Sequence, residues 1–265
     1  MNKPRFDLWS VFWAILALLY FFIPLYGTLD FSLRMKKGEI SLLAYSIVLS
    51  DPKFLSSFQY SIIMGIISVT LSVLIFVPTV YWLYLKMPKA RPIVEIITIL
   101  PFVIPVIVYV YGINTTFGRP PFRMTFNAFT TDILMVGGYI ILSMPYMYRA
   151  IDVGMRTIDV RTLTEAAQSM GASWTQILFN VIFPNLRIAI LSGSLISFAT
   201  VIGELILGDF LLRPALGPYM AEVGRDKAFE PAALAIISYA LTWISLGLIQ
   251  YFSRGNSMQR QLTGR

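Results

Sequence analysis

Residues 162–184 read TLTEAAQSMGASWTQILFNVIFP, and this polar stretch between two apolar runs decides how the chain is organised. Thr162 and Glu165 have the spacing of a capping box, in which each side chain bonds the other residue's backbone N–H at the start of a helix. Apolar side chains then fall at i, i+3, i+4 and i+7, on one face of that helix: Leu163, Ala166, Ala167 and Met170. Gly171 is the expected end of the helix, because glycine adopts the left-handed conformation without a Cβ penalty.

A second short helix is predicted directly after this glycine. Ser173 and Gln176 repeat the capping-box spacing. Apolar residues again follow at helical spacing: Trp174, Ile177, Leu178 and Val181. Pro184 lies just beyond them, so the stretch is interpreted as two short helices around a turn.

The first of these helices is too short to be stable alone, because isolated helices below roughly 12–15 residues are marginal in water. Its small apolar face must therefore pack against something. One candidate is the rest of this chain. The other is a groove on a separate cytoplasmic protein, which the two alanines would allow to approach closely.

Working outward, six apolar runs are long enough to cross a bilayer core of about 30 Å as helices. The runs are Leu8–Tyr26, Phe58–Leu85, Ile93–Tyr111, Ile133–Tyr148, Ile188–Leu207 and Ala232–Phe252. The fourth is short and is expected to begin a few residues earlier. The sequence thus predicts an all-α membrane protein with six transmembrane helices, in one domain over 1–265, with an N-terminal anchor helix over about 8–26.

Composition agrees with a membrane protein and excludes several classes of enzyme. Of the 265 residues, 57% are hydrophobic and 13% are charged, and the mean hydropathy is +0.71. The chain has no histidine and no cysteine, which excludes disulfides, thiolate or histidine metal sites and Ser-His-Asp triads. It has no P-loop of the form G-x-x-x-x-G-K-[ST] either. We therefore expect no catalytic residue, no metal site and no cofactor in this chain.

The net charge of +7 sits in short loops between apolar runs, which argues against a nucleic-acid partner and for contact with membrane lipid. With the N-terminus inside, 12 of the 21 Lys and Arg residues fall on the cytoplasmic side. Positive residues favour that side, so both termini are predicted to be cytoplasmic.

The third run contains Pro101 and Pro105, each of which removes a helical hydrogen bond. This helix is expected to kink or open, and broken helices at membrane depth often line a substrate cavity. A kink without a further role is the alternative. Tyr109 and Tyr111, at the outer end of the run, could hold an ammonium group or belong to an interfacial aromatic belt.

Two acidic residues lie inside the expected spans, where ionisable groups are costly. Glu95 is close to Lys89 and Arg91, which predicts a local ion pair near the interface. Glu204 falls in the outer leaflet of the fifth run. It could face a cationic substrate, or it could bond a neighbouring helix or Arg213.

One pattern in the polar stretch resembles a known signature. Glu165-Ala166-Ala167, three residues, Gly171, nine residues and Val181-Ile-Phe-Pro184 are similar to E-A-A-x3-G-x9-I-x-L-P, the EAA signature of permease subunits of binding-protein-dependent ABC importers. The two departures, Val181 and Phe183, keep an apolar group. The number of spans, the length and the position of the motif before the penultimate helix also fit, most closely the spermidine/putrescine type.

The resemblance implies a type I importer permease fold, with a five-helix core over about 57–252 behind the anchor helix. It implies a polar loop over about 150–186 that carries a cytoplasmic coupling helix. In that helix Glu165 would be the charged contact, Ala166 and Ala167 the close-packed face and Gly171 the turn, with Leu163 and Met170 on the docking surface. Glu204, Tyr109, Tyr111, Pro101 and Pro105 are the candidates for the substrate path.

The same resemblance implies the partners and the location. A dimer of ABC ATPase subunits would bind ATP and Mg, a second permease subunit (a related chain rather than an identical one) would complete the path, and an extracytoplasmic binding protein would deliver a small solute. The best guess for that solute is a polyamine-like compound, and the expected location is the bacterial cytoplasmic (inner) membrane. The alternative is a self-sufficient ion-coupled secondary transporter. Such a protein would be expected to carry carboxylates near the midplane of the membrane and two repeated halves in its sequence.

Overall fold

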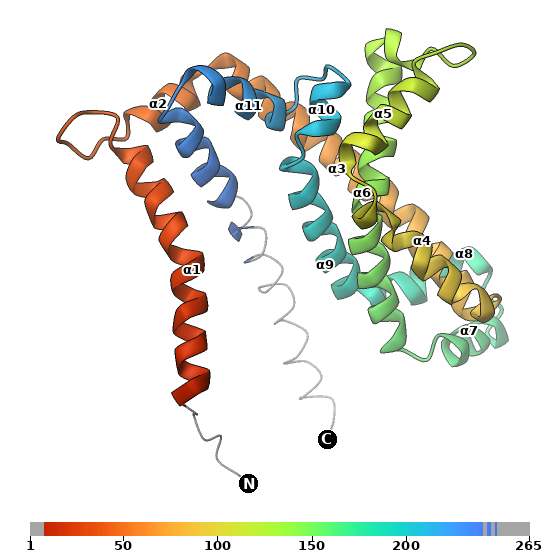
Figure 1. Cartoon of the computed structure of the whole chain (residues 1–265). Helices are drawn as coiled ribbons and strands as arrows, with labels where there is room; N and C mark the ends of the chain where they lie inside the picture. Colours follow the sequence, from red (N-terminus) through yellow and green to blue (C-terminus); the bar gives the residue numbers. More distant parts are fainter. Residues whose placement is uncertain (1–7, 241–242, 245–246, 248–265) are drawn as a thin grey trace. The chain divides into compact units, whose positions relative to one another are not determined.

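The computed structural model describes residues 8–240, 243–244 and 247 (Figure 1). The described residues form helices joined by turns and short loops, and no β-strand occurs among them. The prediction of an all-α protein is therefore confirmed. The described residues divide into two compact units, one of residues 8–55 and 220–240 and one of residues 56–219 with 243, 244 and 247.

The first unit is built on α1 (Leu8–Leu33) and α2 (Leu43–Ser50). It also holds the last residues of α11 (Leu216–Asp226) and a helical stretch over 230–240. Phe31 stacks on Phe229 with ring centroids 4.7 Å apart, and the Ser32 and Tyr45 hydroxyls are 2.7 Å apart. These contacts join the end of α1 to its neighbours, whereas most side chains along α1 are exposed.

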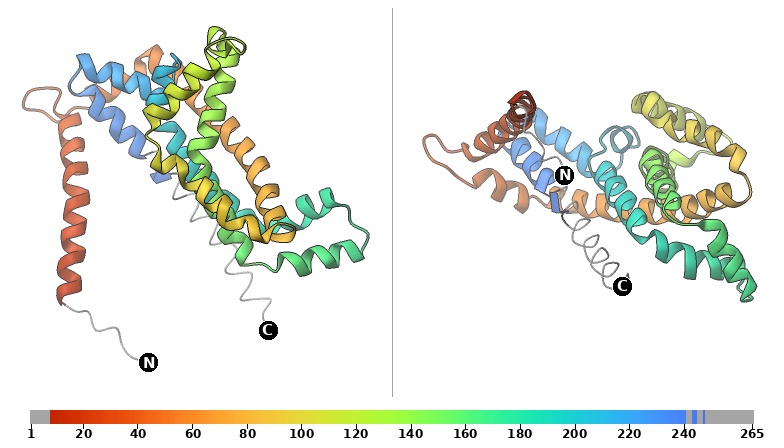
Figure 2. Two further views of the ribbon diagram at one scale, coloured as in Figure 1. Left: turned by 45° about the vertical axis from the view of Figure 1, so that its right-hand side comes forward. Right: turned by 90° about the horizontal axis from the view of Figure 1, so that it is seen from below.

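The second unit contains the remaining helices. They are α3 (Pro52–Leu85), η1 (Pro88–Ala90), α4 (Arg91–Val103), α5 (Val106–Phe117), η2 (Met124–Phe126), α6 (Ala128–Arg156), α7 (Val160–Ser169), α8 (Trp174–Gln176), η3 (Ile177–Ile182), α9 (Phe183–Ile202) and α10 (Ile206–Phe210). Helices α6 and α9 lie side by side in both figures, and α4 packs on α6 (Figures 1 and 2). A Cβ on Gly154 of α6 would lie 2.5 Å from Ala189 of α9, which shows how closely the two backbones approach.

Four helical stretches are long and apolar enough to span a membrane: Trp9–Leu33, Pro52–Leu85, Ala128–Arg156 and Trp174–Ile202. Helices α4 and α5 add a fifth if they count as one broken span; the chain bends by 98° between them. The predicted opening of the third run is thus confirmed, with Pro105 at the break. The expected sixth span, Ala232–Phe252, lies partly outside the described residues, so six spans are not confirmed.

One boundary agrees with the predictions and one differs. The fourth span begins at Ala128, a few residues before Ile133, as expected. The prediction of a separate second short helix is wrong, because α8, η3 and α9 run on without a break from Trp174 to Ile202. Pro184 does not end this helix. It lies in the first turn of α9, directly after the six-residue π-helical segment η3, and π-bulges are one of the irregularities that long helices accommodate.

An apolar core at one end of the second unit fixes the position of α7. Its buried members come from α3, α6, α7, η3 and α9, and include Tyr81, Met155, Val160, Ala167 and Ile182. From this core α7 and α8 extend at the end of the unit where α6 finishes and α9 begins (Figure 2).

Candidate functional site

Helix α7 begins three residues earlier than predicted. Its N-cap is Asp159, whose carboxylate accepts from the Thr162 backbone N–H at 3.1 Å and from the Thr162 hydroxyl at 2.7 Å. The backbone N–H of Thr162 is the main reason why the pKa of Asp159 lies below its usual value. The predicted Thr162–Glu165 capping box is therefore wrong, because Thr162 already lies in the first turn.

The Glu165 side chain lies on the exposed side of α7. Its carboxylate accepts from the Arg161 guanidinium one turn earlier, at 2.8 Å, and both side chains are largely exposed. Exposed i,i+4 pairs of this kind contribute only about 0.3–0.5 kcal/mol, so the pair orients the two side chains more than it stabilises the helix.

The buried face of α7 is not the predicted stripe. Val160, Thr164 and Ala167 face the core, and the Thr164 hydroxyl lies 3.0 Å from the Tyr81 hydroxyl of α3. Of the predicted stripe, Ala167 is buried and Leu163 is half-buried, whereas Ala166 is exposed and Met170 is 82% exposed. The helix therefore packs on its own chain through one face. It presents a second, partly apolar face outward, where a separate protein has access to it.

The turn after α7 follows the prediction closely. Gly171 has φ +82, the Gly171 N–H donates to Gln168 O at 2.9 Å, and the Ala172 N–H donates to Ala167 O at 3.0 Å. These two bonds form a Schellman motif, which satisfies carbonyls at the end of a helix. The second capping box is confirmed as well, with Ser173 and Gln176 bonded reciprocally at the start of α8.

A small pocket of about 340 Å³ lies beside α7. Its walls are the end of α3 with the residues after it, the exposed side of α7, and Trp174. The Lys86 ammonium is 5.6 Å from the centroid of the Trp174 ring, and Trp82 packs on the same ring at 5.2 Å. Lys86, Arg161 and Glu165 all line this pocket.

Two clusters of tyrosine, aspartate and arginine were not anticipated. We name them for the predicted orientation: the inner triad is Tyr84, Asp152 and Arg91, and the outer triad is Tyr60, Asp132 and Arg213. In each, the tyrosine is on α3, the aspartate is on α6 and the arginine comes from a third part of the chain.

In the inner triad, Arg91 at the start of α4 lies 3.0 Å from Asp152 and 2.9 Å from the Tyr84 hydroxyl. The expected pairing of Glu95 with Lys89 or Arg91 is wrong, because Arg91 bonds Asp152 and the Glu95 carboxylate is 3.9 Å from Arg156. An acidic residue one turn before Arg156, at the end of an apolar run, was the signal available in the sequence.

In the outer triad, Arg213 lies in the connection between α10 and α11. Its Nε is 2.7 Å from Asp132 and 3.1 Å from the Tyr60 hydroxyl, which also donates to Asp132. The next residue on α3, Ser61, accepts from the Leu216 N–H at 2.8 Å. The start of α11 is thereby tied to α3.

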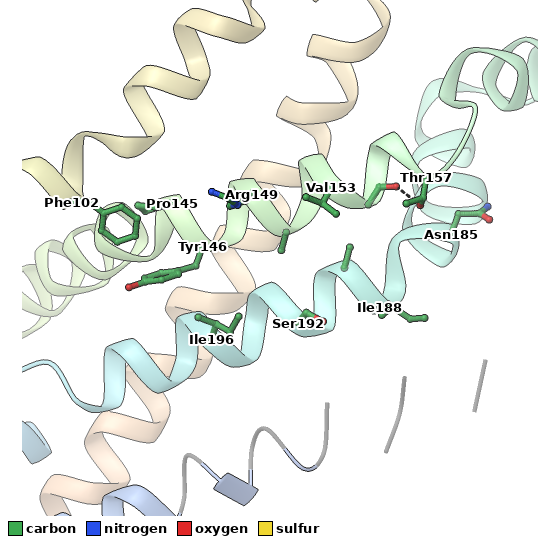
Figure 3. Close-up of a pocket in the computed structure, with 13 residues that line it drawn as sticks. Phe102, Pro145, Tyr146, Arg149, Val153, Thr157, Asn185, Ile188, Ser192 and Ile196 are labelled. Carbon is green, nitrogen blue, oxygen red and sulfur yellow. Dashed lines mark hydrogen bonds between the residues drawn. The ribbon is translucent and has the colours of Figure 1, made fainter. Parts of the chain in front are cut away.

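An apolar groove of about 840 Å³ lies between α6 and α9, with Phe102 of α4 at one end (Figure 3). Polar groups are few along it. They include Tyr146 and Arg149 of α6 and Asn185 and Ser192 of α9. None of these was predicted as a site residue, because a groove between helices depends on how closely their backbones approach.

The predicted path residues do not form one cluster. Glu204 follows the end of α9, and its carboxylate accepts the Ile206 and Leu207 N–H groups at 2.8 Å each, at the start of α10. Its anticipated partner Arg213 bonds Asp132 instead. Tyr109 packs on the apolar core between α5, α6 and α10, whereas Tyr111 is exposed. Pro101 lies within α4, and Pro105 caps α5.

The long apolar helices define a helical membrane protein with several spans. A model of the family described as binding-protein-dependent transport system inner membrane component matches residues 81–256, which is more than half of the chain. The chain belongs to this family. It is thus a permease subunit of an ABC importer in the inner membrane, a class of subunit that is not an enzyme in itself.

The names of its relatives refer to different solutes. The spermidine/putrescine transport system permease protein PotC of Escherichia coli (strain K12) is 26% identical over 216 residues, which cover 79% of this chain and 78% of the relative. PotB of Haemophilus influenzae is 25% identical over 62% of this chain, and the match spans 60% of the length of PotB. The molybdenum transport system permease protein ModB of Escherichia coli (strain K12) is 28% identical over 63% of this chain and 77% of the relative.

Solved structures confirm the fold. The crystal structure of a bacterial alginate ABC transporter, in complex with an alginate pentasaccharide-bound periplasmic protein, contains a chain that matches 96% of this one with a TM-score of 0.68. The match covers 95% of that chain at 16% sequence identity. The protein therefore has the type I importer permease fold that the sequence predicted.

Proposed function

We propose that this permease subunit takes its driving force from separate ATPase subunits that dock on α7. The observation that carries the proposal is the division of α7 into two faces. Val160, Thr164 and Ala167 hold the helix on its own chain, while Ala166 and the 82% exposed Met170 are left for a partner. A large exposed apolar side chain beside an exposed alanine suits close approach by another protein.

In this proposal Glu165 is the charged contact, Leu163 lies at the edge of the docking surface and Gly171 sets the direction of the chain after it. The ATPase dimer binds the ATP and Mg, because this chain has no P-loop. A second permease subunit, related rather than identical, completes the path. A binding protein on the outer side supplies the solute, with both termini of this chain on the inner side.

Docking on α7 is tested with two matched variants. Met170→Glu places a charge on the proposed surface, and Ile40→Glu makes the same change at an apolar side chain that is 83% exposed in the loop between α1 and α2. Co-purification of the ATPase with the tagged permease should fall about tenfold for Met170→Glu, since roughly 1.4 kcal/mol of lost binding free energy has that effect. It should be unchanged for Ile40→Glu. Equal ATPase recovery with both variants would contradict docking on α7.

The finer proposal is that the solute is polyamine-like. It is supported by the similarity to PotB and PotC, while the comparable identity to ModB makes molybdate the competing ligand. Glu204, Tyr109, Tyr111 and the broken helix at Pro101 and Pro105 are the proposed path residues.

Uptake of radiolabelled spermidine and of molybdate, measured in cells with and without this chain, decides between the two solutes. Spermidine uptake that depends on the chain is expected. Dependence of molybdate uptake alone would overturn the polyamine proposal. Membership of the importer family favours ATP-driven uptake over the ion-coupled alternative, which predicts transport by the purified chain in an ion gradient.

A further inference from the structure

A buried carboxylate joins three helices at the end of the molecule that carries α7. The Asp152 side chain is only 6% exposed. The Tyr84 hydroxyl of α3 and the Arg91 guanidinium of α4 each lie 3.0 Å from its Oδ1, and the Arg156 guanidinium lies 2.7 Å from its Oδ2. A buried charge is tolerated only when it is paired and hydrogen-bonded. The bonds to Asp152 therefore hold the three helices in one geometry.

The same part of α3 also holds α7. Tyr81 lies one helical turn before Tyr84 and is almost wholly buried, and its hydroxyl is 3.0 Å from the Thr164 hydroxyl of α7. Residues three apart share a helix face. One turn of α3 thus bonds α7 through Tyr81, and bonds α4 through Tyr84, both directly at Arg91 and through Asp152.

Helix α4 follows α3 after the short connection over residues 86–90, and Val94 in its first turn packs on the apolar core that α3, α6 and α7 share. In both figures the first turn of α4 lies at the end of the second unit that also holds the last turn of α6 and α7 (Figures 1 and 2). Arg91, its first residue, is bonded to Asp152 and to the Tyr84 hydroxyl, and its guanidinium stacks 4.1 Å from the Tyr84 ring centroid. From there α4 runs to the break at Pro105.

We infer that Asp152 is a positioning residue that makes α4 move together with α7. A displacement of α7 is passed to α3 through Tyr81 and to α4 through Tyr84, Asp152 and Arg91, so the broken span α4–α5 follows the coupling helix. The inference rests on the proposed docking of an ATPase on α7.

The test measures the distance between α4 and α7 in the assembled transporter. Because the chain has no cysteine, Ile93→Cys on α4 and Gln168→Cys on α7, both at exposed positions, take spin labels selectively once the partner subunits are made cysteine-free. Pulsed electron paramagnetic resonance in nanodiscs gives the label distance without nucleotide and with ATP and vanadate. In the parent, one narrow distance maximum is expected in both states.

Asp152→Asn should widen this distribution roughly twofold in the ATP state, because an uncharged partner no longer anchors Arg91. Asp132→Asn is the matched control. It makes the same change on the same helix, in the outer triad, and should leave the α4–α7 distribution unchanged. Where Asp152→Asn fails to fold, Tyr84→Phe, which removes a single hydroxyl, takes its place with the same expected widening.

A parent-like distribution in Asp152→Asn or, in its place, Tyr84→Phe would overturn the inference while the ATPase remains bound. Equal widening by Asp132→Asn would overturn it too, because the effect would then be general loosening. Failure of the ATPase to bind the parent complex would instead overturn the proposed function, and the inference with it, before any variant is measured.

Discussion

The inner and outer triads each join a tyrosine of α3, an aspartate of α6 and an arginine from a third part of the chain, yet they differ in burial and in what they hold. The Asp152 side chain is 6% exposed and has a second arginine partner, Arg156, whereas the Asp132 side chain is 24% exposed. The inner triad secures the start of a long helix beside α7. The outer triad secures the short connection between α10 and α11. The comparison teaches that one motif serves as a tightly buried joint at one end and a looser one at the other.

The largest expected effect is the difference between Asp152→Ala and Asp132→Ala. Loss of Asp152 leaves Arg91 without its buried counter-charge, which should lower the free energy of unfolding by about 3 kcal/mol. Loss of Asp132, whose side chain is 24% exposed, should cost roughly 1 kcal/mol, because a partly exposed ion pair contributes less than a buried one. Chemical unfolding in detergent, followed by circular dichroism, measures both. Equal losses would show that the two triads are equivalent joints.

A smaller effect is expected at the turn after α7. Gly171→Val forces a β-branched residue to φ +82, which should cost about 2 kcal/mol although no atom lies within 4 Å of the new Cβ. Gly137→Val in α6 is the control, because it has equally open space and no left-handed backbone. The thermal unfolding midpoint should fall for Gly171→Val and stay near the parent for Gly137→Val. An equal fall of the unfolding midpoint in Gly137→Val would mean that the size of the new side chain, and not the backbone conformation, causes the loss of stability.

The smallest effect concerns a similar turn after α10, next to Arg213 of the outer triad. Leu212 ends α10 with φ +52, where a glycine would fit better, and its side chain is 88% exposed. Leu212→Gly should raise the free energy of unfolding by roughly 0.5 kcal/mol, because the relieved strain exceeds the entropy that glycine adds to the unfolded chain. Unfolding in detergent under the same conditions would reveal the gain. A loss of stability would indicate that the exposed leucine makes a contact worth more than the strain.

The sequence predicted the turn after α7 well and the start of α7 poorly, for identifiable reasons. Gly171, Ser173 and Gln176 act within a few residues of one another, so their pattern is visible in the chain. The start of α7 was misplaced because Asp159 and Thr162 are both good N-caps three residues apart, and only the packing of Val160 into the core selects the earlier one.

The triads could not have been predicted from spacing. Tyr84 and Asp152 are 68 residues apart, and Arg213 and Tyr60 are 153 apart. Neither separation corresponds to a helical or strand period, so only the tertiary fold reveals these pairs. The break between α4 and α5 was predictable because proline acts on its own backbone.

The spacing of the two triads has a geometric consequence for α3. Between its two tyrosines α3 advances about 36 Å, while α6 advances about 30 Å between its two aspartates, at 1.5 Å per residue. Both helices run in the same direction, and they share both end points. Helix α3 must therefore cross α6 at an angle or bend along its length. It cannot slide lengthwise along α6 while the bonds of both triads hold.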